Sequence, residues 1–186
     1  MNLNKLYIDH GVKWGIIQFA IVAAIYFTMY FIDVRFAVTT GLWITMPISI
    51  ALLVVQGLQA RPIGGGVLAY GDAFKTLFIA ALVSSILFVA SGFIIKAYIA
   101  PEKAEEEKIV NIENAVKGME KWNFDEDKID LAVEKMQEKD AKPTLVDTLL
   151  GLVFFVFFDT ILVLIIAIFV KKKPKDGEVI AQEQTT

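Results

Sequence analysis

One acidic residue stands out because it interrupts a long apolar run. Asp159 lies near the middle of residues 144–170, which are otherwise almost free of charge. An ionised carboxylate at the centre of a bilayer costs about 2.5–3.5 kcal/mol on insertion scales, so such residues usually face the protein interior, pair with another group or transfer protons or ions. Asp159 is therefore the first candidate for chemistry in this chain.

The depth of Asp159 in its helix indicates its partners. It precedes Val170 by eleven residues, or roughly 16 Å of helix. Ser84 and Ser85 follow Lys75 by nine and ten residues, which places them at nearly the same height on an antiparallel neighbour. Either hydroxyl is predicted to bond Asp159, whereas Lys75 lies lower and needs its full side chain and a water to reach.

Three interpretations of Asp159 stay open at this stage. The first is a polar contact between helices, which typically contributes about 0.6 kcal/mol in measured membrane proteins. The second is a proton or ion relay, and the third is a contact with a partner helix. A relay is the interpretation that gives the chain a transport activity.

Other chemistry finds little support. His10 is the only histidine and there is no cysteine, so a Ser-His-Asp triad and a thiolate metal site are not expected. The segment 125–127 is acidic but lacks the glycine and spacing of a calcium loop, and 64–66 lacks the frame of a phosphate loop. We therefore expect no catalytic residue, no metal, no cofactor and no enzyme activity.

The glycines 64–66 are interpreted as a turn between two spans, with a re-entrant or lipid-headgroup contact as the alternative. Asp72 and Lys75 are predicted to pair locally on a helix. Together with Arg61 they form the one polar cluster that would suit an enzyme acting on lipid, the least favoured class.

The composition indicates a membrane protein. Of 186 residues, 56% are hydrophobic and fourteen are Phe. The net charge is −3, but residues 100–143 hold thirteen Asp or Glu against eight Lys. A basic surface for nucleic acid is thus not expected.

The fold class predicted is all-α membrane, with four transmembrane helices and a helical hairpin inserted between helices 3 and 4. The spans are read as Trp14–Ile32, Leu42–Leu58, Ala73–Ile99 and Thr144–Val170. The first is interpreted as a retained helix, since it exceeds a signal-peptide core and no cleavage site follows. Gly41 is expected to open the second span, with Pro47 near its first turn and Trp43 as an interfacial anchor. Thr144 and Asp147 have the spacing of a capping box.

The insertion at 100–143 carries two amphipathic patterns typical of helices. Its predicted interaction face consists of Ile109, Ile112, Val116, Met119, Ile129, Val133 and Met136. Asp125 is predicted to cap the second helix. The charged face is interpreted as solubilising, with cation binding as the alternative.

The domain organisation follows from these elements: 1–99 holds three spans, 100–143 the hairpin, 144–170 the fourth span and 171–186 a basic then polar tail. Four positive charges within 171–175 directly follow the last span. They favour cytoplasmic termini and a periplasmic hairpin.

Two motifs carry a family resemblance. Tyr70-Gly71-Asp72-Ala73-Phe74-Lys75 resembles an F-G-Q-A-F-K signature, and 119–129 is similar to a charged M-E-K-x-G-x-x-E-E-x-I segment. Both are typical of the bacterial domain-of-unknown-function family 4199, found mostly in Bacteroidota. Asp72 stands where glutamine is usual, and Asn123 where glycine is usual. The resemblance implies four helices in a bacterial inner membrane and carries over no catalytic residue.

The function expected is that of a scaffold or accessory subunit of a membrane complex. The alternative is a small proton- or ion-coupled transporter that uses Asp159. The partners expected are the lipid bilayer and either other membrane proteins or further copies of the chain.

Overall fold

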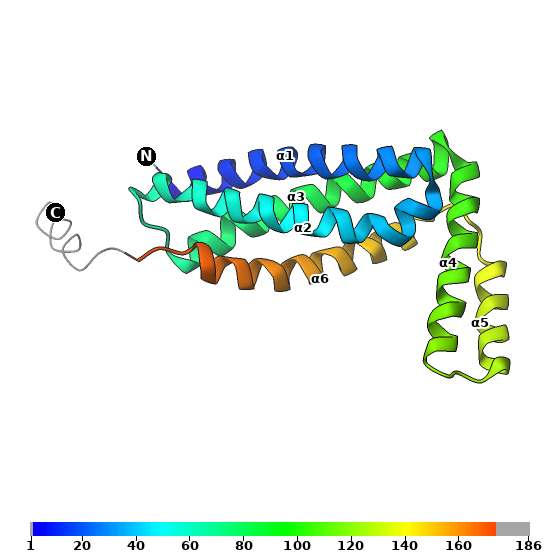
Figure 1. Ribbon diagram of the computed structural model, residues 1–186. Helices are drawn as coiled ribbons and strands as arrows, with labels where there is room; N and C mark the ends of the chain where they lie inside the picture. The colour runs from blue at the N-terminus through cyan, green and yellow to red at the C-terminus, as the bar shows by residue number, and fades with distance from the viewer. Residues whose placement is uncertain (1, 174–186) are drawn as a thin grey trace, which may run out of the picture. The chain divides into compact units, whose positions relative to one another are not determined.

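The computed structural model describes residues 2–173, and this part of the chain is all-helical, without a strand (Figure 1). The elements are α1 (Leu3–Ile32), α2 (Val34–Ala60), the 3-10 turn η1 (Arg61–Gly64), α3 (Tyr70–Ile94), the π-helical turn η2 (Ile95–Ile99), α4 (Pro101–Lys121), α5 (Glu126–Glu138) and α6 (Leu145–Val170). The predicted helical class is confirmed. Most of the predicted tail, residues 174–186, lies outside the described range.

Four helical stretches are long and apolar enough to cross a membrane: Leu3–Ile32, Val34–Gly64, Tyr70–Ile99 and Leu145–Val170. At about 1.5 Å per residue, even the shortest exceeds the roughly 30 Å hydrocarbon core. The prediction of four helices long and apolar enough to span a membrane is confirmed. Between the third and fourth spans lie α4 and α5.

The first two spans begin earlier than predicted. α1 starts at Leu3 rather than at residue 14, and α2 starts at Val34 rather than at residue 42. The early start of α2 follows from a cap, because the Asp33 carboxylate accepts the Phe36 N–H at 2.9 Å. Pro47 consequently lies inside α2, well beyond its first turn.

The start of the fourth span follows its predicted chemistry. The Thr144 hydroxyl accepts the Asp147 N–H at 3.1 Å, and the Asp147 carboxylate accepts the Thr144 N–H at 3.2 Å. This reciprocal pair confirms the capping box. The cap predicted for α5 is wrong: Asp125 stands at the N-cap position, but its carboxylate pairs with Lys128 at 2.8 Å and caps no N–H.

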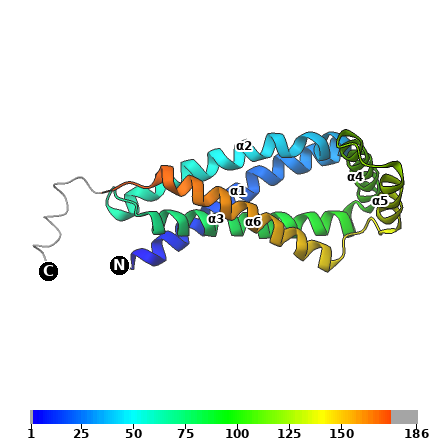
Figure 2. The same cartoon turned by 90° about the horizontal axis from the view of Figure 1, so that it is seen from below.

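The chain divides into two compact units, each formed from parts of the long helices. The first comprises residues 2–21, 47–87 and 152–173 of the described range. Its core joins α2, α3 and the C-terminal stretch of α6 (Figure 2). The core residues of these three helices are Leu53, Ala60, Ala73, Leu77, Ala81, Val163, Ile166, Ala167 and Val170.

Within the first unit, α1 packs closely on α3 through two glycines four residues apart. A Cβ at Gly11 would lie 2.7 Å from the Thr76 carbonyl oxygen, and one at Gly15 would lie 2.7 Å from that of Ala80. Such small-residue pairs let two helix backbones approach closely in a membrane. The sequence predictions did not include this glycine pair on the first span.

The second unit comprises Val22–Met46 and Phe88–Gly151. Its buried core is Tyr30, Val34 and Ala37, with Tyr26 and Ile95 packed against it. α4 contacts both η2 and α5. Pro101 at the first position of α4 cannot donate a backbone hydrogen bond, which separates α4 from the preceding turn.

The glycine contact between α1 and α3 gives a first prediction. We expect Gly15→Ala to lower the free energy of unfolding by about 1–3 kcal/mol, because the new methyl group meets a backbone carbonyl and the Val83 side chain at 2.8 Å. Gly92→Ala is the matched control: it is also helical, and nothing lies within 4 Å of its added Cβ. Unfolding in detergent measures both variants. An equal loss of unfolding free energy in the two variants would contradict close packing at Gly15.

Candidate functional site

The predicted intramembrane site lies in the first unit, between α3 and α6. The Ser85 hydroxyl donates a hydrogen bond to Oδ2 of Asp159 at 2.5 Å. Asp159 is partly buried, so neighbouring side chains partly shield this hydrogen bond. Of the two candidate serines, Ser85 makes the contact, whereas Ser84 is buried beside it at 7% exposure.

Lys75 belongs to a different group of residues. Its ammonium donates to the Asn4 side-chain oxygen at 2.7 Å and lies 3.5 Å from Asp72. The predicted Asp72–Lys75 pair is confirmed, but the structure does not bring Lys75 to Asp159. The reason is depth, because Lys75 precedes Ser85, the partner of Asp159, by ten residues, or roughly 15 Å of helix.

Arg61, the third member of the predicted interfacial cluster, is engaged elsewhere. Its Nε donates to the Val170 carbonyl at 3.0 Å. A cation at this position satisfies a free carbonyl at the C-terminus of α6 and opposes the helix dipole. The neighbouring glycines form a turn, in which Gly65 and Gly66 have φ of 69° and 92°.

A buried polar network connects α1, α2 and α3, and the sequence predictions missed it. The Gln56 amide donates to the Thr76 carbonyl at 2.9 Å, and the Thr76 hydroxyl donates to the Tyr7 carbonyl at 3.0 Å. His10 Nε2 lies 3.2 Å from the Gln56 carbonyl. Gln56 is fully buried, yet its Oε1 has no hydrogen-bond partner in the described part of the chain. An uncharged glutamine inside the second apolar run was the available signal.

These polar groups are suited to holding helices together. Residues 2–173 contain no group of three or more His, Cys, Asp or Glu arranged to hold a metal ion. The hydrogen bond of Asp159 in the described chain is to the neutral Ser85 hydroxyl, which keeps its proton, rather than to a second titratable side chain. The site therefore provides a single intramembrane acid with one neutral partner.

In the second unit, the residues of the predicted interaction face of α4 and α5 differ in burial. Six of its seven members are partly buried: Ile112, Val116, Met119, Ile129, Val133 and Met136. Ile109, in contrast, is 56% exposed, while the next residue, Val110, is buried at 1%. At this turn, the buried face of α4 is therefore shifted by one residue from the predicted apolar face. Ala104 and Val110 are the buried residues of this helix.

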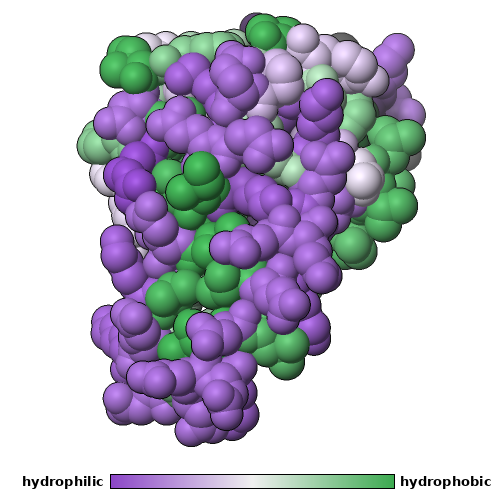
Figure 3. All heavy atoms as spheres, turned by 90° about the vertical axis from the view of Figure 1, so that its right-hand side faces the viewer, coloured by the Kyte–Doolittle hydropathy of each residue, from purple (hydrophilic) through white to green (hydrophobic). Residues whose placement is uncertain are grey.

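Several large apolar side chains of α4, α5 and their connection stay exposed. Trp122 is 79% exposed, Leu131 52% and Phe124 49%. Hydrophilic residues cover most of the face that these helices present, and a narrower apolar strip runs through it (Figure 3). Exposed aromatic residues in a hydrophilic surface often mark an interaction site.

An ion pair connects α4 with the start of α2. Arg35 donates from Nη1 to Oε2 of Glu113 at 2.5 Å and from Nη2 to Oε1 at 3.0 Å. Such bidentate geometry is characteristic of strong arginine–carboxylate contacts. The hydrogen bonds from Arg35 lower the pKa of Glu113 below its ordinary value of 4.5.

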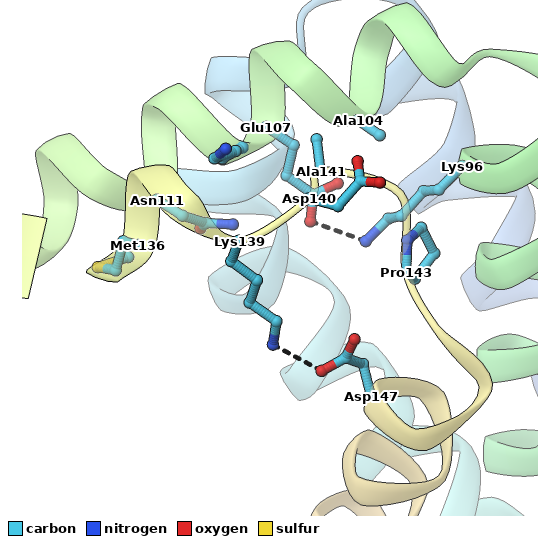
Figure 4. Close-up of a pocket in the computed structure, with 11 residues that line it drawn as sticks. Lys96, Ala104, Glu107, Asn111, Met136, Lys139, Asp140, Ala141, Pro143 and Asp147 are labelled. Atoms are coloured by element: carbon cyan, nitrogen blue, oxygen red, sulfur yellow. Dashed lines mark hydrogen bonds and ion pairs between the residues drawn. The ribbon is translucent and has the colours of Figure 1, made fainter. Parts of the chain in front are cut away.

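A cavity of about 350 Å³ also lies in the second unit, at the base of α4 and α5 (Figure 4). Two ion pairs border it: Lys96 of η2 with Glu107 of α4 at 2.7 Å, and Lys139 with Asp147 of α6 at 2.6 Å. Lys108 and Asp140 are further charged residues in its lining. The lining thus contains three positive and three negative groups.

One of three comparisons with known proteins gives a match. The family model described as "Protein of unknown function (DUF4199)" matches residues 13–172. The chain belongs to the DUF4199 family. No curated protein and no solved structure matches it.

The DUF4199 match runs through all four candidate spans and both α4 and α5. It therefore includes Asp159, Ser85 and every residue bordering the cavity. His10 and Tyr7 of the polar network precede the matched range. The expected resemblance is confirmed at the level of the family.

The Asp159–Ser85 bond gives a second prediction. In a double-mutant cycle with Ser85→Ala and Asp159→Ala, we expect a coupling energy of about 0.6 kcal/mol, with ~1.7 kcal/mol as the upper range for such bonds in membranes. Reversible unfolding in mixed micelles gives the four free energies. Ser84→Ala in the same cycle is the control and should couple by less than about 0.3 kcal/mol. Similar coupling for both serines would refute a specific bond.

The Arg35–Glu113 pair gives a third prediction, on pH. Because the pKa of Glu113 is lower in the folded protein, the pair stabilises fully above pH 4.5, the ordinary value, and is lost as the pH falls through the lowered pKa. We expect Glu113→Gln to melt below wild type at pH 7, and the gap to shrink at pH 3. Glu120→Gln, an exposed change on the same helix, should show no such gap. A gap that persists at pH 3 would rule out the ion pair as its cause.

Proposed function

We propose that this DUF4199 protein is a scaffold or accessory subunit of a membrane complex in a bacterial inner membrane, and not an enzyme. The observation that carries the proposal is the exposure of Trp122 and Phe124 at the connection between α4 and α5. Large aromatic side chains anchor many protein interfaces, because they bury much apolar area with few rotatable bonds. A partner that covers them is the simplest reason for their position.

The composition of α4 and α5 supports this proposal. Both helices are rich in Lys and Glu, which a spanning helix does not tolerate. They follow the third span and precede the fourth, so we propose that they form an extramembrane hairpin. Lys171, Lys172 and Lys173 directly after α6 favour cytoplasmic termini and hence a periplasmic hairpin.

The apolar outer surface of α6 is consistent with contact to lipid or to another membrane helix. Phe154, Phe157, Phe158 and Phe169 are all exposed on it. Membrane helices associate through packing rather than through the hydrophobic effect, so this surface does not by itself distinguish a partner helix from lipid. The proposed hairpin is the more informative surface, because exposed aromatic residues in water need a partner more than those in lipid do.

A proton-coupled transporter is the second candidate. The specific observation in its favour is the presence of Asp159 with a hydrogen-bonding hydroxyl inside an apolar span. The buried glutamine and threonine of the first unit add polar groups along the helices. A relay requires Asp159 to gain and lose its proton during turnover, so Asp159→Asn would abolish transport while leaving the hairpin unchanged.

The fourth prediction separates the two functions. We expect crosslinking and purification of the tagged protein from its own membrane to retain a stoichiometric partner with wild type and with Asp159→Asn. The double variant Trp122→Ser, Phe124→Ser should lose the partner, since it removes the aromatic anchors. Glu120→Ser is the matched control, because it is exposed, close in sequence and polar.

The opposite pattern would favour transport. A wild-type protein that is recovered alone would contradict the accessory role. Proton flux into liposomes that stops with Asp159→Asn but not with the double aromatic variant would then assign the function to the intramembrane acid.

A further inference from the structure

The cavity at the base of α4 and α5 has an unusual charge balance. Two of its cations are already neutralised, because Lys96 pairs with Glu107 and Lys139 pairs with Asp147. Within the described residues, Lys108 forms no ion pair and donates only to the Gln137 carbonyl, at 2.7 Å. The lining thus keeps one cation that is available to a ligand.

The cavity also keeps one available anion. The Asp140 side chain is exposed and accepts a hydrogen bond from the Lys142 N–H at 3.2 Å. It belongs to none of the ion pairs found in the described range. A ligand with one anionic and one cationic group can complement both free charges. A purely anionic ligand would instead meet three carboxylates in the lining, and a purely cationic one would meet three ammonium groups.

The position of the cavity indicates what kind of ligand this is. Lys96 lies in η2, the last turn of the third candidate span, and Asp147 lies in the first turn of the fourth. The first turns of α6 beyond the cavity expose Leu145, Leu149 and Leu150. A molecule with its polar head in the cavity can therefore lay the first part of an apolar tail along these turns of α6.

We propose that this cavity binds the headgroup of a zwitterionic phospholipid with a primary ammonium group, of the phosphoethanolamine type. Lys108 faces the phosphate and Asp140 accepts hydrogen bonds from the ammonium. A volume of about 350 Å³ lies at the lower end of the roughly 300–1,000 Å³ typical of small-ligand sites. A primary ammonium has three N–H donors, as lysine does, whereas the trimethylated choline group has none to offer Asp140.

The inference is independent of the accessory role, because it concerns a lipid and not the aromatic residues of the hairpin connection. The same headgroup chemistry also occurs in free phosphoethanolamine. The exposed leucines of α6 favour the lipid as the source, since the soluble molecule has no tail to cover them. The test therefore includes both molecules.

The fifth prediction tests this site on the full-length protein, stripped of lipid in detergent. Native mass spectrometry would compare phosphatidylethanolamine, phosphatidylcholine and phosphatidylglycerol with identical acyl chains. We expect the ethanolamine lipid to bind about tenfold more tightly than either of the others, the size of effect that one charge-assisted hydrogen bond gives. Equal binding of the three lipids, or a preference for the glycerol lipid, would overturn the proposal.

Matched variants test whether the lipid preference arises at the cavity. Lys108→Gln and the nearly isosteric Asp140→Asn should each remove most of the preference. Lys117→Gln and Asp130→Asn change exposed charges of the same kinds on α4 and α5, outside the cavity lining, and should keep it. Melting temperatures close to wild type for Asp140→Asn exclude unfolding as the cause. Loss of the preference in the control variants would show that overall charge, and not the cavity, governs binding.

Free phosphoethanolamine is the competitor that identifies the source. If it displaces the lipid, the headgroup alone carries recognition, and a soluble ligand can occupy the same site. If it does not compete while the lipid preference persists, the acyl chain contributes and the bilayer supplies the ligand. Either result distinguishes the source of the ligand only after the lipid comparison has shown that the cavity prefers the ethanolamine headgroup.

Discussion

The absence of water in the hydrocarbon core determines where polar groups can lie in this protein. Helices satisfy their backbone hydrogen bonds internally, which leaves polar side chains in the spans to find partners on neighbouring helices. Gln56 and Thr76 do so by donating to backbone carbonyls of other helices, at 2.9 and 3.0 Å. Ser85 does so by donating to Asp159. The same constraint thus accounts for both the buried network and the intramembrane acid.

These hydrogen bonds form only where two helices lie close together, and small residues allow that approach. Lipid tails are as apolar as leucine, so helix association in a membrane depends on van der Waals contact and polar bonds rather than on exclusion of water. Gly11 and Gly15 let α1 approach α3, and a Cβ on Gly57 would lie 2.8 Å from Val170. Arg61 then bonds the Val170 carbonyl, so packing and polar contact fix the end of α6 together.

The sequence was sufficient to predict features that depend on local composition. The four spans and the cap of α6 follow from hydropathy and from the spacing of Thr144 and Asp147. The start of α2 did not follow, because the Asp33 cap lies between two apolar runs and the polar residues after it resembled a loop. Gln56 was the available signal for the buried network, but its burial did not follow from the sequence, since one glutamine in an apolar run fits either surface. The inward position of Val110 rather than Ile109 depends on how α4 meets η2, which periodicity alone does not determine.

The contrast between the two candidate sites is physical. Asp159 is a single acid whose hydrogen-bond partner is neutral, so it can balance at most one positive charge, and holding the carboxylate ionised in a medium of low dielectric constant is costly. The cavity of the second unit holds charges of both signs and lies where the third candidate span ends and the fourth begins. A charged ligand loses less hydration there and gains hydrogen bonds to Lys108 and Asp140. A ligand that carries both charges is therefore better matched by the cavity at the ends of the spans than by the single acid within them.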